Sequence, residues 1–233
     1  MTIAENIRMI RAEIQTAALS AGKDPSKILL LAATKMNDAD RVQQAIRAGV
    51  DICGENRVQE MLEKNEQSAY AGCPLHFIGH LQKNKVRQVV GLAELIHGVH
   101  DTELLEAIHK EAKKRGIVQD VLLEVNIAAE ESKSGFAPEK IADALHFASA
   151  LDCIRVRGLM AIPPVCENSA ENRPYFARME QLFVDNSGKK YDNVHMDFLS
   201  MGMSGDYREA VAFGANILRL GSAIFGPRIY KQH

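Results

Sequence analysis

The sequence predicts a single α/β domain, a (β/α)8 barrel of the TIM type with an extra N-terminal helix. Eight apolar, strand-like segments alternate with helical patterns along 233 residues, a length that suits eight βα units. The two longest segments without regular structure, 128–136 and 163–169, both follow strands, as loops at the functional face of a barrel do. No composition shift or linker divides residues 1–233, so we expect one domain.

The extra helix is expected over residues 2–21, ending before Gly22. Its apolar positions recur every three to four residues, which is the helical period; they are Ile3, Ile7, Ile10 and Ile14. The strands follow the helix, and they are predicted over residues 28–35, 51–55, 75–80, 94–99, 118–127, 154–162, 195–203 and 216–224.

The helix after the fourth strand has the clearest boundaries. Asp101 is a good N-cap, the run Lys113-Lys114-Arg115 complements the helix dipole, and Gly116 suits the position just beyond the end. The main alternative to a barrel is an open doubly wound sheet, whose usual sign is a glycine-rich turn after the first strand. The turn Thr34-Lys35-Met36-Asn37 contains no glycine, which favours the barrel.

The composition excludes several classes of partner. Hydrophobic residues make up 46% of the chain, yet no stretch is long and apolar enough to span a bilayer. The N-terminus lacks the pattern of a signal peptide, so we expect a cytoplasmic location and no membrane partner. A net charge of −2 argues against nucleic acid as the main partner. The short basic cluster at 83–87 has no role that the sequence reveals.

The cysteines and histidines do not predict a metal site. The four cysteines show no C-x-x-C pairing, and scattered thiols in a cytosolic chain are most often reduced and buried. His76 and His80 are four residues apart, a spacing that suits a metal on a helix, but their segment reads as a strand. No carboxylate stands at a convincing spacing from them, and we therefore expect no metal.

Lys35 is the most informative residue of the chain. It closes the apolar run 28–33 after Thr34, and a helix start follows at Asn37-Asp38-Ala39-Asp40. Reactive side chains of parallel α/β proteins lie at the carboxyl ends of strands. We expect apolar neighbours to lower the pKa of the Lys35 ammonium and to free an amine that can attack a carbonyl. The alternative is a lysine that merely reaches the surface at a strand end.

Two further strand ends predict a phosphate site. The seventh strand leads into Ser200–Asp206 and the eighth into Arg219–Gly226, and both segments place glycine and serine where backbone N–H groups are exposed. Barrels frequently bind phosphate between these two loops. Taken singly, Ser204 reads as an N-cap and Gly221 as a packing glycine; together they favour phosphate. Asp206 is expected to point away, because a carboxylate repels phosphate.

Arg219 completes the predicted constellation. It shares a strand face with Gly221, so an inward orientation would place a guanidinium in the barrel mouth. The alternative is a buried pair of Arg219 with a carboxylate. A strand-end lysine, a phosphate cup and an inward arginine together describe a site for pyridoxal 5′-phosphate, because the lysine condenses with the aldehyde and the ring nitrogen needs a charged partner.

Seven motifs run in order over nearly the whole chain: AATK at 32–35, GENRVQE at 54–60, HFIGHLQKNK at 76–85, SKSGF at 132–136, GLMAI at 158–162, SMGMS at 200–204 and RLGSAIFG at 219–226. Through these motifs the chain resembles the pyridoxal phosphate homeostasis proteins, a family of barrel proteins related to the alanine racemase N-terminal domain.

The resemblance implies a role for individual residues. Lys35 would form the Schiff base with the cofactor, Arg219 would face the pyridine nitrogen and Asn56 would lie near it. The phosphate would be bound by Ser204, Gly221 and Ser222. The resemblance also implies that residues 1–233 form one monomeric, intracellular, pyridoxal phosphate-binding domain without established catalysis. Such a protein keeps free pyridoxal phosphate low and supplies it to apo-enzymes that depend on it.

Two observations bear on whether the protein is a carrier or an enzyme. Arg219 is always charged and disfavours a protonated ring nitrogen, which weakens the cofactor as an electron sink. Racemisation needs a second base opposite the lysine. In alanine racemases that base is a tyrosine from an additional C-terminal domain, for which we expect this chain to have no room, and Tyr207 or another loop residue stays open as a candidate. Three hypotheses remain: a carrier, a low-efficiency amino-acid racemase, and a barrel enzyme that acts on a phosphorylated sugar through a lysine Schiff base without pyridoxal.

Overall fold

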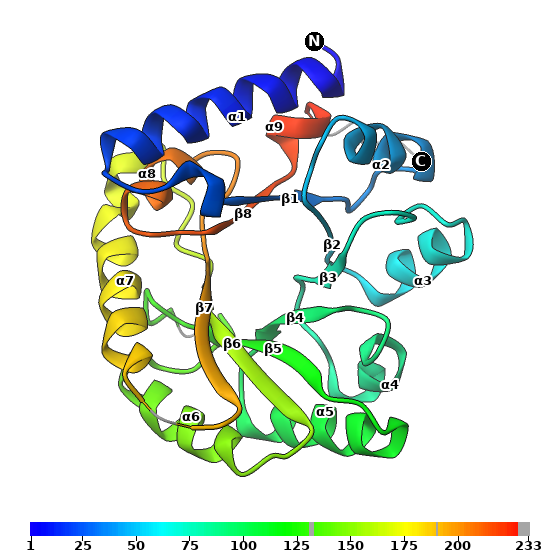
Figure 1. Cartoon of the computed structure of the whole chain (residues 1–233), viewed down its shortest axis with the longest axis vertical. Helices are drawn as coiled ribbons and strands as arrows, with labels where there is room; N and C mark the ends of the chain where they lie inside the picture. Colours follow the sequence, from blue (N-terminus) through cyan, green and yellow to red (C-terminus); the bar gives the residue numbers. More distant parts are fainter. Residues whose placement is uncertain (131–132, 190, 228–233) are drawn as a thin grey trace.

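The strands of the computed structural model form a ring with helices around its outside (Figure 1). The structure describes residues 1–130, 133–189 and 191–227. Within these ranges eight parallel strands pair in chain order, and the last pairs with the first to close the barrel. The predicted (β/α)8 fold is therefore confirmed.

The described strands are β1 (Leu29–Ala33), β2 (Ile52–Glu55), β3 (Leu75–Phe77), β4 (Leu95–Val99), β5 (Gln119–Val125), β6 (Ile154–Ala161), β7 (Val194–Ser200) and β8 (Ile217–Leu220). The α-helices are α1 (Ile3–Ser20), α2 (Ala39–Arg47), α3 (Val58–Glu66), α4 (Val86–Val89), α5 (Thr102–Arg115), α6 (Ile141–Ser149), α7 (Arg173–Ser187), α8 (Tyr207–Ala212) and α9 (Ser222–Phe225). Short 3-10 helices are η1 (Pro25–Lys27), η2 (Lys83–Lys85), η3 (Pro138–Lys140) and η4 (Ser169–Asn172).

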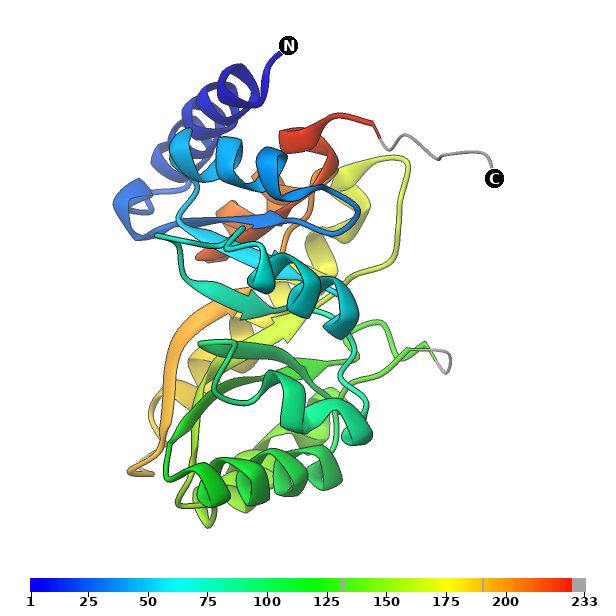
Figure 2. The same ribbon diagram turned by 90° about the vertical axis from the view of Figure 1, so that its right-hand side faces the viewer.

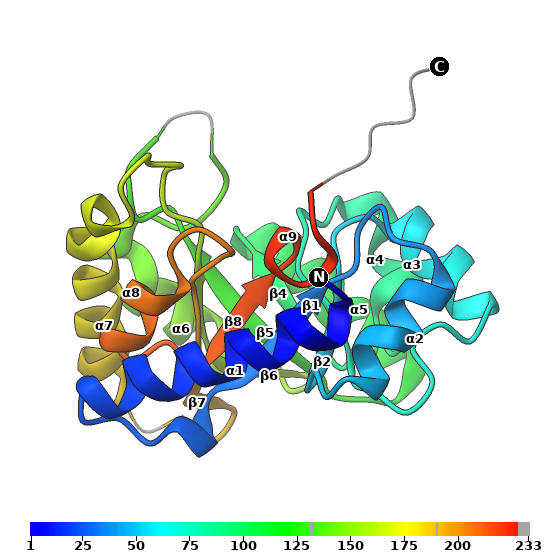
Figure 3. The same ribbon diagram turned by 90° about the horizontal axis from the view of Figure 1, so that it is seen from above.

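Helix α1 is the predicted extra helix. It begins with a capping box, in which the Thr2 side chain accepts from the Glu5 N–H and the Glu5 carboxylate accepts from the Thr2 N–H. Figure 3 shows α1 running past α8 and α9. The Asn6 side chain donates to the Ile224 carbonyl of α9 at 2.9 Å, which attaches α1 to the helix that follows the last strand.

The strands are apolar along most of their length because both faces are buried. A large cluster of buried side chains fills the space between strands and helices. A second, smaller cluster fills the barrel interior; its buried members are Leu31, Ala33, Ile52, Ile78, Leu95, Leu122, Met160 and Ile217. The interior is therefore packed, and the mouth at the strand ends is left for a site.

Six of the predicted strands end earlier than expected: those over 75–80, 118–127 and 154–162 end at Phe77, Val125 and Ala161, and the other three carry residues of the predicted site. Residues 216–224 contain β8 only to Leu220, and α9 begins at Ser222 after Gly221. The strand predicted over 28–35 ends at Ala33, because the next residues form a tight turn. The strand predicted over 195–203 ends at Ser200. In the strands predicted over 28–35, 195–203 and 216–224, residues of the lysine or phosphate motif leave the strand just where the site begins.

The loops after β5 and β6 extend from the same side of the barrel (Figures 2 and 3), as their positions after strands require. Residues 131–132 of the first loop, with Ser132 of the SKSGF motif, lie outside the described residues. Helix α5 has the predicted ends, with the Asp101 side chain accepting from the Leu104 N–H and Gly116 in the left-handed region. Among the described helices, none has the length and apolar character of a membrane span.

Candidate functional site

Lys35 lies in a tight turn two residues beyond β1. The Asn37 N–H donates to the Thr34 carbonyl at 3.1 Å and closes the turn, and the Asn37 side chain donates to the Lys35 carbonyl at 3.0 Å. Met36, the third residue of the turn, has a φ of 61°, the left-handed value that a type II turn requires there. Lys35 itself is half-buried. The turn therefore holds a lysine of limited exposure at the carboxyl end of β1.

The loops after β7 and β8 meet at Ser204. Its Oγ accepts from the backbone N–H groups of Gly221 and Ala223, both at 3.2 Å. Ser222 stands between them, exposed, at the first position of α9. Two N–H groups thus converge on one oxygen, and a phosphate oxygen is a stronger acceptor than a hydroxyl. This corner has the donors of the predicted phosphate cup.

Gly221 lies beside the end of β1. Leu31 pairs with Arg219 in the β1–β8 register, which carries Gly221 next to Ala33. A Cβ at Gly221 would lie 3.7 Å from the Ala33 methyl group, an ordinary contact, so the protein's own packing does not demand a glycine here. The strand pairing therefore places the cup and the Lys35 turn side by side on the mouth.

Asp206 and Tyr207 are both engaged away from the cup. The Asp206 carboxylate accepts from the Met203 N–H at 2.7 Å and from the Asn172 side chain at 2.9 Å. The Tyr207 hydroxyl donates to Glu13 of α1. Burial, together with Glu13, raises the pKa of Tyr207 to about 12. Tyr207 therefore belongs to the contact between α8 and α1.

Arg219 points its guanidinium into the barrel, where it is 5% exposed. One of its nitrogens donates to Ser200 Oγ at 2.6 Å and another to the Ala161 carbonyl at 2.9 Å. Among the described residues, no carboxylate oxygen lies within 4.0 Å of the guanidinium. The alternative prediction, a direct pair of Arg219 with a carboxylate, is therefore wrong within the described part of the chain. Burial lowers the pKa of Arg219 to about 10, although the charges of Glu124 and Asp206 oppose this.

Arg219 is the first member of a buried chain of hydrogen bonds that the sequence analysis did not predict. Ser200 Oγ lies 3.0 Å from His97 Nδ1, and His97 Nε2 lies 2.9 Å from His76 Nδ1. A neutral imidazole has one donor and one acceptor nitrogen, so the chain is complete when Ser200 accepts from Arg219 and donates to His97 Nδ1, and His97 Nε2–H donates to His76 Nδ1. Burial lowers the pKa of His76 to about 3 and that of His97 well below its usual value, which keeps both rings neutral.

Asn56 lies on the other side of the Lys35 turn. Ala33 of β1 pairs with Gly54 of β2, and Asn56 follows the end of β2. Gly79 lets the loops after β2 and β3 pack closely, since a Cβ there would lie 2.0 Å from the Asn56 carbonyl oxygen. The Asn56 side-chain oxygen is buried and has no hydrogen-bond partner in the described structure. A buried acceptor of this kind needs a partner, which a ligand can supply.

His80 lies apart from the buried His76. Its Nδ1 is 3.1 Å from Ser134 Oγ, and its ring stacks on His100 with centroids 4.4 Å apart. The two histidines thus have separate partners, and the prediction that the site holds no metal stays a prediction.

A small hollow of about 160 Å³ lies at the mouth between β5 and β6; its lining is Glu124, Val125, Asn126, Lys133, Ser134 and Ile162. Burial raises the pKa of Glu124, although His100 and Arg219 oppose the shift. The sequence analysis did not single out Glu124, although one acid inside the apolar run Val121–Val125 indicates a polar group that faces the barrel interior. His97 within β4 was a signal of the same kind, because polar side chains rarely face a barrel interior without a partner.

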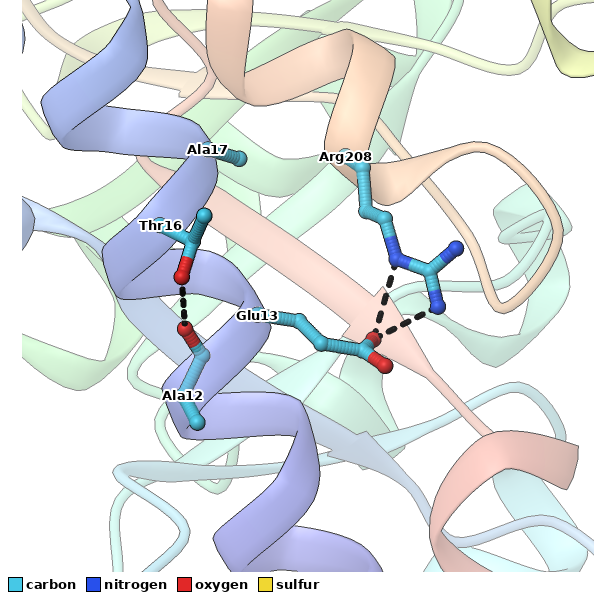
Figure 4. Close-up of a pocket in the computed structure, with 5 residues that line it drawn as sticks. All are labelled: Ala12, Glu13, Thr16, Ala17 and Arg208. Carbon is cyan, nitrogen blue, oxygen red and sulfur yellow. Dashed lines mark hydrogen bonds and ion pairs between the residues drawn. The ribbon is translucent and has the colours of Figure 1, made fainter.

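A larger hollow of about 550 Å³ lies outside the barrel between α1 and α8 (Figure 4). It is lined by Ala12, Glu13, Thr16, Ala17 and Arg208. The Arg208 guanidinium donates to the Glu13 carboxylate at 2.7 Å, so its two charged groups already neutralise one another. None of the predicted site residues takes part in it.

Comparison with known proteins relates the whole chain to one family. The model of the alanine racemase N-terminal domain matches residues 2–229. The chain is 40% identical over 230 residues to the pyridoxal phosphate homeostasis protein of Aquifex aeolicus, covering 99% of this chain and 100% of the relative. It is 39% identical to the protein of that name from Pseudomonas aeruginosa, with 98% and 97% coverage.

Solved structures relate the chain to the same family. PipY of Synechococcus elongatus with pyridoxal phosphate bound superposes with a TM-score of 0.82 at 30% identity, covering 97% of this chain and 100% of that one. An alanine racemase of Clostridium difficile shares the fold, with a TM-score of 0.70 at 14% identity; the match covers 96% of this chain and 57% of the racemase. The chain belongs to the alanine racemase N-terminal domain family and, within it, to the pyridoxal phosphate homeostasis proteins.

Proposed function

We propose that this protein binds pyridoxal 5′-phosphate through Lys35 and acts in intracellular pyridoxal phosphate homeostasis, as a cofactor carrier and regulator. The observation that carries the proposal is the meeting, on one barrel mouth, of the Lys35 turn, the N–H groups at Ser204 and a buried arginine with neutral hydrogen-bond partners. The names of the relatives and the cofactor bound to PipY support it. In this proposal residues 1–233 form one cytoplasmic, monomeric binding domain.

The donors and acceptors present fit the cofactor. The N–H groups of Gly221 and Ala223, with the hydroxyls of Ser204 and Ser222, would hold the phosphate. Arg219 would donate to the ring nitrogen, and the unpartnered oxygen of Asn56 gives a further polar contact. Bound through its aldehyde, pyridoxal phosphate supplies a reactive imine and an electron-withdrawing ring.

The protein's own residues favour a carrier over a catalyst. The pKa of Arg219 stays near 10, so the guanidinium remains charged at neutral pH and cannot accept a proton from the ring nitrogen. Tyr207, the residue considered as a second base, has its hydroxyl on Glu13 of α1. Racemisation needs a base on each face of the substrate carbon. We therefore propose that the protein has no efficient racemase activity.

Borohydride reduction followed by peptide mass mapping tests the binding mode. Purified protein loaded with pyridoxal phosphate should carry a pyridoxyl group on Lys35. An adduct on another lysine, or none, would contradict the proposal. A colourless protein with a lysine that captures a phosphorylated sugar would instead indicate the enzyme that works without pyridoxal.

Exchange of the α-proton of L- and D-amino acids in deuterated water separates the carrier from a racemase. We expect exchange far slower than ordinary enzymatic turnover of about 1 to 1000 per second. Turnover within that range would favour the racemase.

A titration of the loaded protein with an apo-enzyme that depends on pyridoxal phosphate tests the supply role. Transfer faster than spontaneous release would indicate direct docking, whereas equal rates would indicate supply through free cofactor. The 83–87 cluster can be tested in the same assay with Lys85→Ala. Lys83 suits this purpose less, because it pairs with Glu103.

A further inference from the structure

A buried ion pair lies directly beneath the Lys35 turn. Glu55, the last residue of β2, is fully buried, and Lys64 of α3 has an 8% exposed side chain; their Oε2 and Nζ atoms are 2.8 Å apart. The other oxygen of Glu55 accepts from the Asn56 N–H at 2.9 Å, and the Tyr70 hydroxyl donates to Oε2 at 3.3 Å. Burying two charges is costly, so a buried ion pair is weak evidence for a role in stability alone.

The ion pair and a third charge contact the backbone on both sides of Lys35. Lys64 Nζ donates to the Thr34 carbonyl at 2.8 Å, and the Thr34 hydroxyl donates to Glu55 Oε2 at 2.8 Å. Glu60 Oε2 accepts from the Met36 N–H at 2.7 Å and from Lys64 Nζ at 3.2 Å. The residue before Lys35 and the residue after it are thus both bonded to one charged cluster.

The turn needs such support because of its sequence. Met36 has a φ of 61°, a conformation that side chains other than glycine and asparagine rarely adopt. Met36 is 52% exposed and so contributes little packing to hold this conformation. Burial opposes a low pKa for Glu60, but the hydrogen bonds from Met36 and Lys64 outweigh it and lower that pKa, so Glu60 is ionised at neutral pH.

We propose that Glu55, Glu60 and Lys64 are positioning residues, which hold the left-handed turn so that the Lys35 amine is presented to the cofactor in one orientation. This inference rests on the proposed function. It also gives a role to the GENRVQE motif at 54–60, of which the proposed cofactor site uses only Asn56.

Glu60→Ala is the test variant, because its partly exposed carboxylate can be removed without leaving Lys64 unpaired. We expect the dissociation constant for pyridoxal phosphate, measured by visible absorbance on folded protein, to rise about tenfold, because loss of the Met36–Glu60 bond frees the turn so that roughly one molecule in ten holds it, and the apparent affinity falls by that fraction. Glu63→Ala is the matched control, since Glu63 lies on the same helix and contacts Gln59. It should bind like the wild type.

A rescue variant separates positioning from general stability. Glycine adopts a positive φ without penalty, so Met36→Gly in the Glu60→Ala background should restore affinity to within about threefold of the wild type. Urea unfolding of the cofactor-free variants reports stability independently.

Unchanged affinity in Glu60→Ala, or a loss that Met36→Gly leaves in place, would overturn the inference. Absence of a pyridoxyl–Lys35 adduct in the wild type would instead refute the proposed function. The two failures are therefore distinguishable.

Discussion

Ser200→Ala tests the hydrogen-bond chain inside the barrel. Ser200 Oγ accepts from Arg219 at 2.6 Å and lies 3.0 Å from His97 Nδ1. Its removal deletes a hydrogen bond to a charged group and leaves a buried donor and a buried acceptor without partners. Since such a bond contributes about 1.5 to 3 kcal/mol, we expect the free energy of unfolding to fall by about 2 to 3 kcal/mol.

The assay is urea and thermal unfolding of the cofactor-free protein. For a chain of this length, the expected loss corresponds to a fall in Tm of roughly 4 to 12 °C. Ser187→Ala is the matched control, because its hydroxyl donates to the Phe183 carbonyl on an exposed helix surface. The control should stay within about 0.5 kcal/mol of the wild type. Equal stabilities of Ser200→Ala and Ser187→Ala would refute the assigned network.

The remaining predictions concern the cofactor site and pH. Lys35→Ala should lose the reducible link to pyridoxal phosphate yet keep its unfolding free energy within about 1 kcal/mol, because a half-buried turn lysine adds little to the core; unfolding of this variant would contradict the reading of Lys35. Gly221→Ala should leave stability nearly unchanged, since its Cβ meets Ala33 only at 3.7 Å, but should weaken cofactor binding in an absorbance titration. Tyr207→Phe should not change any residual α-proton exchange, and a strong decrease would reinstate Tyr207 as a base. His76 has a pKa lowered to about 3, so between about pH 6.5 and pH 3 the unfolded state binds a proton that the native state does not. Its stability contribution is complete above pH 6.5 and is lost toward pH 3 at up to about 1.4 kcal/mol per pH unit, and His76→Gln should flatten this slope in urea unfolding.

Local patterns were sufficient for the elements of the fold. Helix α5 begins after Asp101 and ends before Gly116, as predicted, because capping residues act within one turn of the chain. The apolar runs predicted eight parallel strands, because both faces of each strand are buried. The strand ends were predicted less well, since Gly221 and the turn after Ala33 stop pairing through contacts that a hydropathy pattern does not contain.

The candidate site was likewise predicted only in part from the sequence. The sequence by itself determined the fold class and the family resemblance. Strand-end positions pointed to Lys35, Ser204, Arg219 and Gly221, because strand ends of one barrel share a face, and the resemblance added Asn56 and Ser222. Only the tertiary structure decided which side chains support them. His97 and Ser200 are 103 residues apart in the chain, and Lys64 of α3 donates to Thr34 in the turn after β1. A hydrogen bond between distant segments forms only when the donor–acceptor distance is correct to within a few tenths of an ångström. Closure of the barrel sets that distance, and a sequence pattern does not contain it.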